Sequence, residues 1–372
     1  MKRASLLASV AAALVLTAGT AAANDAYIKQ VQNDNAASID QNGTGGVVGS
    51  SGDPVRQDGN DNDIDITQND AGNVGGRAPS YNQFNRGVDQ IGDNNALTVT
   101  QTAGSSVFEV QQDATGGGSG SGSTNLANII QSGNMTLLRL NQTYTGDGTT
   151  GTANQIDVTQ TGGTYQRSGI GEKHGFRQNS DDWGIFQTGH TNQAEITQQG
   201  AGHFIRRLAQ DGAGNDASLI QNGGNGNSVG TSEQTGSNIS ADITQTGFDN
   251  KIGTVSQTDM AGLNTIMTVS MVGNDNGGAS AFTGDAAGAA GSTLASGDFV
   301  QDGSNNQATL NIWGNNNAAA LYSNGSGNVI NGSVGSATSG GNDNQVAVVQ
   351  NGDGNTAAFS QMGSNNNLGI NQ

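Results

Sequence analysis

Several residue types that stabilise ordinary globular domains are scarce in this 372-residue chain. It contains no Cys, which excludes a disulfide framework and argues against a tetrahedral zinc site. Only 13 residues are Lys or Arg against 31 Asp or Glu, and the net charge of −18 argues against nucleic-acid binding. Beyond the first residues no apolar run approaches the ~20 residues of a membrane span, so we expect none.

Large apolar residues are also scarce. Leu, Ile, Val and Phe together make up less than about 20% of the chain, which with a strong net charge is typical of disorder. That inference assumes a globular core, whereas stacked repeats stabilise one another and need little apolar area per residue. A chain with 60 Gly and many Gln and Asn residues can therefore still fold if these residues form repeats.

One spacing recurs along the chain and is clearest near its end. From Gln350, Gly follows after two residues, Asn after five, and apolar residues after seven and nine, before Gln361 begins the series again 11 residues on. The Asn, the apolar residues and the next Gln alternate with other residues, so in a β-strand their side chains share one face. The Gly and Asn before them tolerate positive φ and supply a turn. Each unit therefore predicts one strand and one turn.

Two such units predict one coil of a solenoid. A strand-turn-strand-turn coil takes about 22 residues, and coils stacked at the ~4.8 Å strand spacing give two parallel sheets that face each other. A side-chain amide stacked on its own kind donates to one neighbour and accepts from the other, which satisfies a buried group that otherwise costs about 1–3 kcal/mol. We therefore expect an all-β solenoid or cross-β stack, interrupted by Gly/Ser-rich insertions.

The spacing assigns individual residues to columns of this stack. The expected amide ladder contains Gln90, Asn95, Gln101, Gln187, Asn192, Gln198, Gln210, Asn215, Gln221, Gln350, Asn355, Gln361, Asn366 and Gln372. The expected apolar core contains Ile64, Ile66, Leu97, Val99, Ile156, Val158, Ala194, Ile196, Ala217, Leu219, Ala357, Phe359, Leu368 and Ile370.

The first residues are typical of a secretory signal peptide. Lys2 and Arg3 precede an apolar run, and small residues before Asn24 offer a cleavage site after Ala23. Cleavage there leaves 11 basic against 31 acidic residues, a net charge of −20. We expect a signal peptide over 1–23, a repeat array with insertions over 24–270, a Gly/Ala/Ser-rich linker over 271–299 and a C-terminal repeat block over 300–372.

The spacing Gln-x-Gly-x-x-Asn-x-Ala-x-x-x-Gln resembles the curlin repeat of bacterial curli fibres. Three units, beginning at Gln187, Gln210 and Gln350, match it at every fixed position. The resemblance implies a secreted functional amyloid, exported through an outer-membrane pore and polymerised at the cell surface into pilus-like fibres for adhesion and biofilm matrix. It also implies as partners further copies of this chain or other curlin-like subunits, and the export and assembly proteins of the outer membrane.

The number of units and their long insertions leave three roles open. The chain fits a major fibre subunit, a nucleator of fibres, or a large surface protein. The alternative to a fibre protein is a monomeric β-solenoid adhesin that does not polymerise, because both use the same coil. Gln372 completes a unit without a polar cap, which favours an open edge and hence a fibre.

The sequence offers no constellation for catalysis, so we expect no enzyme, no cofactor and no specific metal site. The three histidines are irregularly spaced for metal ligands, and the Asp-rich turns leave only weak calcium binding open, because the place that calcium repeats give to Asp holds Asn. Thr98 and Thr100 have no regular Thr counterparts, which argues against an ice-binding face. The acidic pair most suited to a glycosidase is used by the repeat. The three histidines are His174, His190 and His203, the Asp-rich turns are 58–63 and 211–216, and the acidic pair is Asp181 with Asp182.

Overall fold

The computed structural model describes most of the chain in segments. These are residues 13–18, 25–42, 45–50, 54–69, 73–75, 88–102, 104–107, 110–114, 126–133, 135–137, 139–144, 154–162, 168–170, 184–259, 261–278, 281–338 and 340–372.

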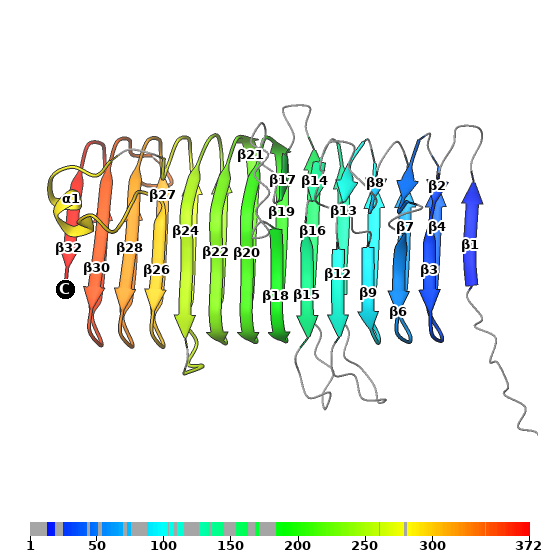
Figure 1. Cartoon of the computed structure of the whole chain (residues 1–372). Coiled ribbons are helices and arrows are strands. Elements are labelled where there is room, and N and C mark those ends of the chain that lie inside the picture. Colours follow the sequence, from blue (N-terminus) through cyan, green and yellow to red (C-terminus); the bar gives the residue numbers. More distant parts are fainter. Residues whose placement is uncertain are drawn as a thin grey trace, which may run out of the picture.

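The described residues form a β-solenoid in which the chain alternates between two long parallel sheets (Figure 1). Sheet A has 13 strands, which pair in chain order. They are β1 (Ala13–Ala18), β4 (Ala36–Gln41), β7 (Asp63–Gln68), β10 (Ala96–Gln101), β13 (Leu126–Ser132), β16 (Gln155–Gly162), β19 (Gln193–Ala201), β21 (Asp216–Asn225), β23 (Ser240–Thr246), β25 (Ile266–Val272), β27 (Gln307–Trp313), β29 (Val329–Val334) and β31 (Thr356–Gln361).

Sheet B has 19 strands, because its first rungs are each split into two short strands. The split rungs are β2 (Asp25–Ala26) with β3 (Ile28–Val31), β5 (Val47–Val48) with β6 (Val55–Asp58), β8 (Asn73–Val74) with β9 (Val88–Gly92), β11 (Ser106–Val107) with β12 (Val110–Ala114), β14 (Met135–Leu137) with β15 (Leu140–Tyr144), and β17 (Ser168–Ile170) with β18 (Gly184–His190). The later strands are β20 (Phe204–Ala213), β22 (Ser228–Ser237), β24 (Lys251–Asp259), β26 (Asp298–Asp302), β28 (Ala318–Asn324), β30 (Gln345–Asn351) and β32 (Asn367–Asn371).

The core lies between the sheets and is built from in-register columns. In sheet A, Ile64 pairs with Leu97 and Ile66 with Val99, and all four side chains are buried. The expected alternation of strand faces is therefore present, with apolar residues inward and Asp, Thr or Ser outward. The same parallel register links β16 with β19 and β21 with β23, and β19 shares it with β21 up to Gln199, after which the register shifts.

Extra residues enter several rungs in the middle of sheet B. Val48 and Val55 are both buried, and the six residues between them separate β5 from β6. In β20 the insertion is smaller: Arg206 and Arg207 both lie outward between the buried Ile205 and Leu208. Two outward residues in succession restore the inward phase, as a β-bulge does, so the core columns stay in register despite the longer coil.

The segment expected as a linker, 271–299, is an insertion of this same kind. It includes the end of β25, the helix α1 (Gly284–Ala290) and the start of β26. Strand β24 pairs directly with β26, and β25 with β27, so the strands before and after the segment belong to one stack. Helix α1 lies outside sheet B at the end formed by β30 and β32 (Figure 1). A Gly/Ala-rich composition therefore does not separate two repeat blocks here.

The expected signal peptide is described only in part. Residues 13–18 form β1, which pairs with β4 in parallel. The proposed cleavage site, Ala23 and Asn24, lies outside the described residues, as do His174, Asp181 and Asp182. Among the described residues, no helix is long and apolar enough to cross a membrane.

Candidate functional site

The most regular polar feature of the stack is a column of Gln side chains in sheet B. Each Nε2 donates to the Oε1 of the next rung over nine consecutive bonds of 2.7–3.2 Å. All but the first of these side chains are buried, and several Nε2 atoms also donate to a backbone carbonyl of sheet A, such as Gln210 to Gln193 at 2.7 Å. The column therefore ties rungs and sheets together. It consists of Gln30, Gln57, Gln90, Gln112, Gln142, Gln187, Gln210, Gln234, Gln257 and Gln301.

Sheet A has a shorter and interrupted Gln column. Gln198 donates to Gln221 and Gln221 to Gln245, both at 2.8 Å. The next three rungs hold Met271, Ile312 and Val334 in the same register, and all three are buried. Replacing several neighbouring amides together by apolar groups leaves few unpaired partners, which explains why the substitutions are consecutive.

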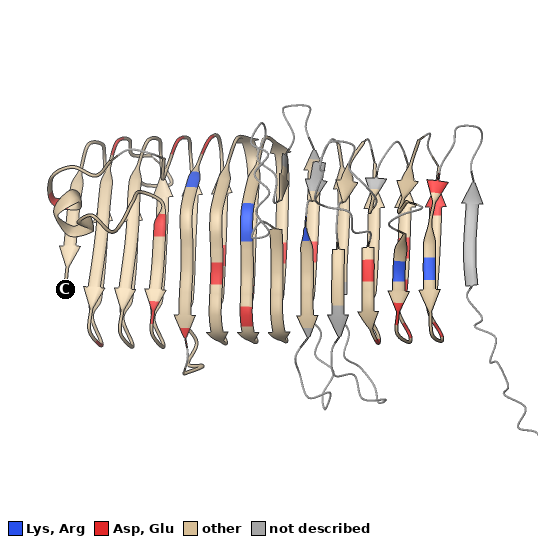
Figure 2. Cartoon of the chain, viewed as in Figure 1, with Lys and Arg blue, Asp and Glu red and all other residues tan. Residues whose placement is uncertain are grey.

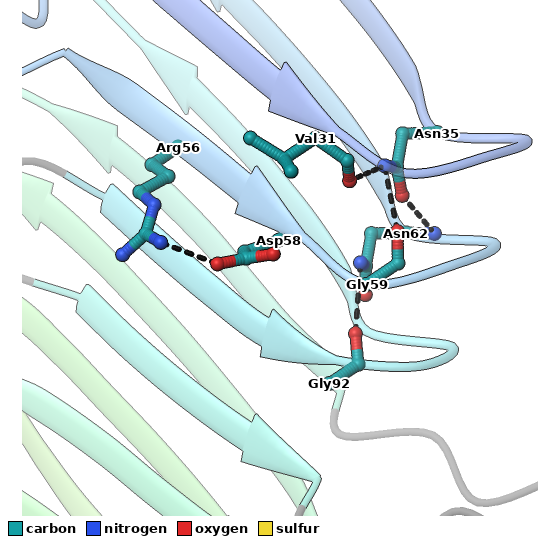
Figure 3. Close-up of polar contacts among 7 residues, drawn as sticks. All are labelled: Val31, Asn35, Arg56, Asp58, Gly59, Asn62 and Gly92. Atoms are coloured by element: carbon teal, nitrogen blue, oxygen red, sulfur yellow. Dashed lines mark hydrogen bonds and ion pairs between the residues drawn. The ribbon is translucent and has the colours of Figure 1, made fainter. Parts of the chain in front are cut away.

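The turns are joined by a second ladder that links the Asn and Gly of successive rungs (Figure 3). The Asn35 Nδ2 donates to the carbonyl of Val31 in its own turn at 2.9 Å and to that of Gly59 in the next rung at 2.8 Å. The backbone N–H of Asn62 donates to Asn35 Oδ1 at 3.1 Å, and Asn62 Nδ2 donates in turn to Gly92 at 2.9 Å. Asn and Gly are therefore required together, because most Asn side chains of this ladder donate to the carbonyl of the Gly in the following rung.

The Gly of this ladder is also required by the close approach of the rungs. At Gly212, φ is +129°, and a Cβ there would lie 1.7 Å from the carbonyl oxygen of Gly236. Gly59 and Gly189 meet the following rung in the same way. The spacing of two residues after Gln thus marks a position where both the backbone conformation and the stacking exclude a side chain.

The structure places most of the expected ladder and core residues inside the stack. Ten of the expected ladder residues up to Gln350 are buried, as are the core residues up to Ala357. Gln361 is buried, whereas Phe359, Leu368 and Ile370 are half-buried because few rungs cover them. Gln372, although exposed, accepts a hydrogen bond from Gln350 at 3.1 Å. Asn355 and Asn366 are half-buried and bond to Asn328 and Asn344.

The Gln column of sheet B is broken at Ser323, a residue that the repeat alone did not mark as special. Ser323 pairs with Gln301 on one side and Gln350 on the other. Three buried atoms at this break have no hydrogen-bond partner: Gln301 Nε2, Ser323 Oγ and Gln350 Oε1. The serine side chain is too short to continue the ladder.

Replacing Ser323 by Gln is expected to stabilise the protein. A Gln there would accept from Gln301 Nε2 and donate to Gln350 Oε1, so the unfolding free energy should rise by about 1–3 kcal/mol. Urea denaturation measures the change, and Asn331→Gln on the exposed face of β29 is the control, expected to stay within about 0.5 kcal/mol of the parent. A destabilised Ser323→Gln variant would show that the ladder geometry is not maintained across this rung.

Charges are divided between the outer faces of the two sheets. All described Lys and Arg residues lie in or beside strands of sheet B, and none follows Lys251 in the chain (Figure 2). The outer face of sheet A carries only acidic charge among its described residues. Burial raises the pKa of Asp157, and burial together with Asp242 and Glu195 raises the pKa of Asp216.

A buried carboxylate replaces the Gly of one turn and was not expected from the sequence. Asp259 follows Gln257 by two residues and accepts from the N–H groups of Ala261 and Gly262, each at 2.9 Å, and from the Ser304 hydroxyl at 2.7 Å. Burial acts to raise the pKa of Asp259, but these bonds, with that from the N–H of Leu263, outweigh it and hold the pKa below its ordinary value. The carboxylate therefore closes a turn in which other residues occupy the ladder positions that usually hold Gly and Asn.

Stability is expected to pass through a maximum at mildly acidic pH. The pKa values of Asp157 and Asp216 are raised by folding, so these groups contribute stability below pH 3.8, the ordinary pKa of Asp. This contribution is lost as the pH rises through their pKa values in the folded protein. The pKa of Asp259 is lowered by folding, so this group contributes stability above pH 3.8. This contribution is lost as the pH falls through its pKa in the folded protein. Urea midpoints measured from pH 3 to pH 8 test this.

Two variants distinguish the effect of these carboxylates on stability from that of general charge repulsion. The double variant Asp157→Asn, Asp216→Asn should lose less stability than the parent between about pH 4 and pH 7. Asp259→Asn should instead lose stability at neutral pH, because its ionised form accepts the turn bonds. Parallel pH profiles for the parent and both variants would contradict the assignment.

Other residues considered from the sequence lie in structural positions. His203 is buried in the place of a turn Asn, its Nε2 lies 3.0 Å from the carbonyl of Gln199, and burial lowers its pKa. His190 is exposed and contacts the Thr191 hydroxyl. In the described part of the chain no three His, Asp or Glu residues are grouped to hold a metal ion. In the turn 58–63, Asp58 forms an ion pair with Arg56 (Figure 3).

Comparison with known families identifies a repeat at the C-terminal end of this stack. Residues 341–372, which include β30, β31 and β32, match the family model of the curlin associated repeat. The whole chain has no match among curated proteins. The matched repeat and the parallel stack together indicate a structural protein of the curli type.

Proposed function

We propose that this protein is a secreted curlin-like amyloid fibre subunit or nucleator that contributes to cell-surface fibres, adhesion and biofilm matrix. The observation that carries the proposal is the last rung of the stack. Strands β31 and β32 have no charged residue, and each pairs with a single described strand, β29 or β30. Uncharged edge strands without a partner are templates for a further chain, and soluble proteins usually protect them with charge or proline.

The ladders also stop at this rung with unused hydrogen-bonding capacity. Gln372 is the last Gln of the sheet B column, and Asn355 and Asn366 occupy the place from which most earlier Asn residues bind the next rung. A further rung with the same spacing would receive these bonds. The added chain is another copy of this protein or another curlin-like subunit, delivered by outer-membrane export proteins after the leader is removed.

The proposal predicts that purified residues 24–372, freed of denaturant, form fibres after a lag, because several coils must order before stacking offsets the loss of chain entropy. Electron microscopy and fibre diffraction with reflections near 4.8 Å and 10 Å test it. A stable monomer without fibres would favour the alternative, a monomeric surface adhesin. The residues inserted between the split strands of sheet B, as between β5 and β6, support that alternative.

A variant with a blocked edge provides the control. Gln372 donates to Val349 and accepts from Asn351, so the backbone of the alternate residue Asn371 faces the open side, and Ser360 in β31 does likewise. Ser360→Pro with Asn371→Pro removes two donors from that side only. The variant should keep most of the parent's urea stability but elongate parent seeds poorly. Unchanged elongation would show that growth does not use this edge.

A further inference from the structure

Helix α1 is bound to the outer face of the last two strands of sheet B. The backbone N–H of Ala286 donates to Asn367 Oδ1 at 2.7 Å, and Asn367 Nδ2 donates to the carbonyl of Thr283 at 2.7 Å. Thr283 also donates its backbone N–H to Gln345 Oε1 at 2.7 Å. A helix of seven residues is too short to be stable alone, so these contacts with β30 and β32 hold it in place.

The sheet surface under α1 is a column of small residues. Ala320, Ala347 and Gly369 pair in register on β28, β30 and β32, each three residues before the ladder position of its rung. Ala347 packs against Ala286 and Ala290, and a Cβ at Gly369 would lie 2.0 Å from the carbonyl oxygen of Asp285. Earlier rungs hold larger residues in this column, such as Arg207 and Asp298. The small residues therefore coincide with the helix.

The helix presents one flank to the open side of the stack. Asp285 and Ala289 lie over β32, whereas Ala286 and Ala290 face β30. Because successive helical residues are turned by about 100°, Gly288 projects away from β30 on the same side as Asp285. A Cβ at Gly288 would meet nothing within 4 Å. Figure 1 shows that the α1 segment extends beyond β32 at this end. A strand added to β32 would therefore lie beside this flank.

We propose that α1 is a clasp that recognises the first rung of a second copy of this chain. The inference rests on the proposed function, because it concerns the same edge. If Gln30 of the second copy follows Gln372 in the ladder, Tyr27 follows Gly369 in the small-residue column, three residues before its Gln. Tyr27 is 39% exposed on the first rung, and β2 and β3 pair only with β5 and β6 among the described strands. Its ring packs against Ala289 and Gly288 of the clasp.

This contact fixes the register of the added chain. The amide ladders repeat in every rung and accept any curlin-like unit, whereas the flank of α1 accepts an outward aromatic ring at one place only. In the equivalent column of rungs β20 and β24 the residues are Arg207 and Thr254, which do not offer the same apolar surface. The clasp therefore selects the N-terminal rung over interior rungs that share the same ladder spacing.

The proposal is tested with a variant whose new side chain fills the space beside α1. Gly288→Trp adds a side chain where a Cβ meets no atom within 4 Å, so the monomer should unfold at the same urea concentration as the parent. Seeds of this variant should nevertheless elongate with parent monomer at least about tenfold more slowly than parent seeds do. Gly288→Ala is the matched control and should elongate at the parent rate. Monomer carrying Tyr27→Ala should elongate the Gly288→Trp seeds faster than parent monomer does.

The elongation rates of these seeds either support or overturn the clasp. Slow growth on Gly288→Trp seeds that Tyr27→Ala monomer relieves supports the clasp. Parent-like growth on Gly288→Trp seeds, or slow growth that Tyr27→Ala does not relieve, overturns it while the fibre function stands. Absence of fibres from the parent chain overturns the fibre function itself, and the clasp with it.

Discussion

Replacing Gly212 by Ala is expected to destabilise the protein by more than about 4 kcal/mol, at the upper end of single substitutions. The new Cβ would lie 1.7 Å from the carbonyl oxygen of Gly236, and the conflict is with backbone that is itself fixed by the ladder. Moving Gly236 away would weaken its bond from Asn215 Nδ2, now 3.1 Å long. Urea denaturation of the parent and variant measures the loss.

Gly354→Ala is the matched control for this substitution. Gly354 also has a positive φ, +70°, but a Cβ there would meet nothing within 4 Å. It should therefore lose only the cost of a side chain in the left-handed region, about 1–2 kcal/mol. Equal losses at Gly212 and Gly354 would mean that Gly serves the turn conformation alone and that contact between rungs is not limiting.

The sequence was sufficient to predict the strands and turns because both depend on local spacing. A period of two places Asn, the apolar residues and Gln on one face. In the turns, positive φ is adopted by Gly and by the residue before the ladder Asn, which is mostly Gly, Asn or Asp. The resemblance carried by the repeats was confirmed at residues 341–372. These features repeat in every rung, so each unit supports the interpretation of the others.

The departures from the repeat could not be predicted, because their effects depend on the neighbouring rung. Gly332 lies at the start of a Gly/Ser-rich stretch of the sequence, yet it occupies a core position of β29, where a Cβ would lie 2.1 Å from the ring of Phe359 in the next rung. Likewise Ser323 breaks a ladder only because Gln301 and Gln350 flank it. Both effects require the stacked register.

The helix could not be predicted for a related reason. Residues 284–290 are rich in Gly and Ala and too few for an independent helix. Their order depends on Asn367 and Gln345, more than 50 residues away in the chain. The one signal in the sequence was the change from large to small residues at the outward positions Ala320, Ala347 and Gly369, which is recognisable only once the rungs are aligned.

Deleting Ser218 is expected to cost more than about 4 kcal/mol, because the deletion reverses the second half of β21. Side chains alternate along a strand, so the deletion would turn Leu219 outward and remove Gln221 from its column. Exposing Leu219 loses about 1.5–3 kcal/mol of apolar burial. The bonds of Gln221 to Gln198 and Gln245 would also be lost, leaving buried amides unpaired at about 1–3 kcal/mol each. Urea denaturation measures the total.

Deleting Gly230 is the matched control, because it removes one residue from a strand without reversing it. In β22, Gly230 and Thr231 both lie outward between the inward Val229 and Ser232, so one of them can be lost and the inward phase kept. Rung β28 already has this shorter form, with Ala320 alone between Ala319 and Leu321. We expect a loss below about 2 kcal/mol, from the mismatch with β20 and β24 alone. If both deletions cost the same, overall Gln and Asn content and not strand register would hold the stack together, and the solenoid would have no special need for its 11-residue spacing.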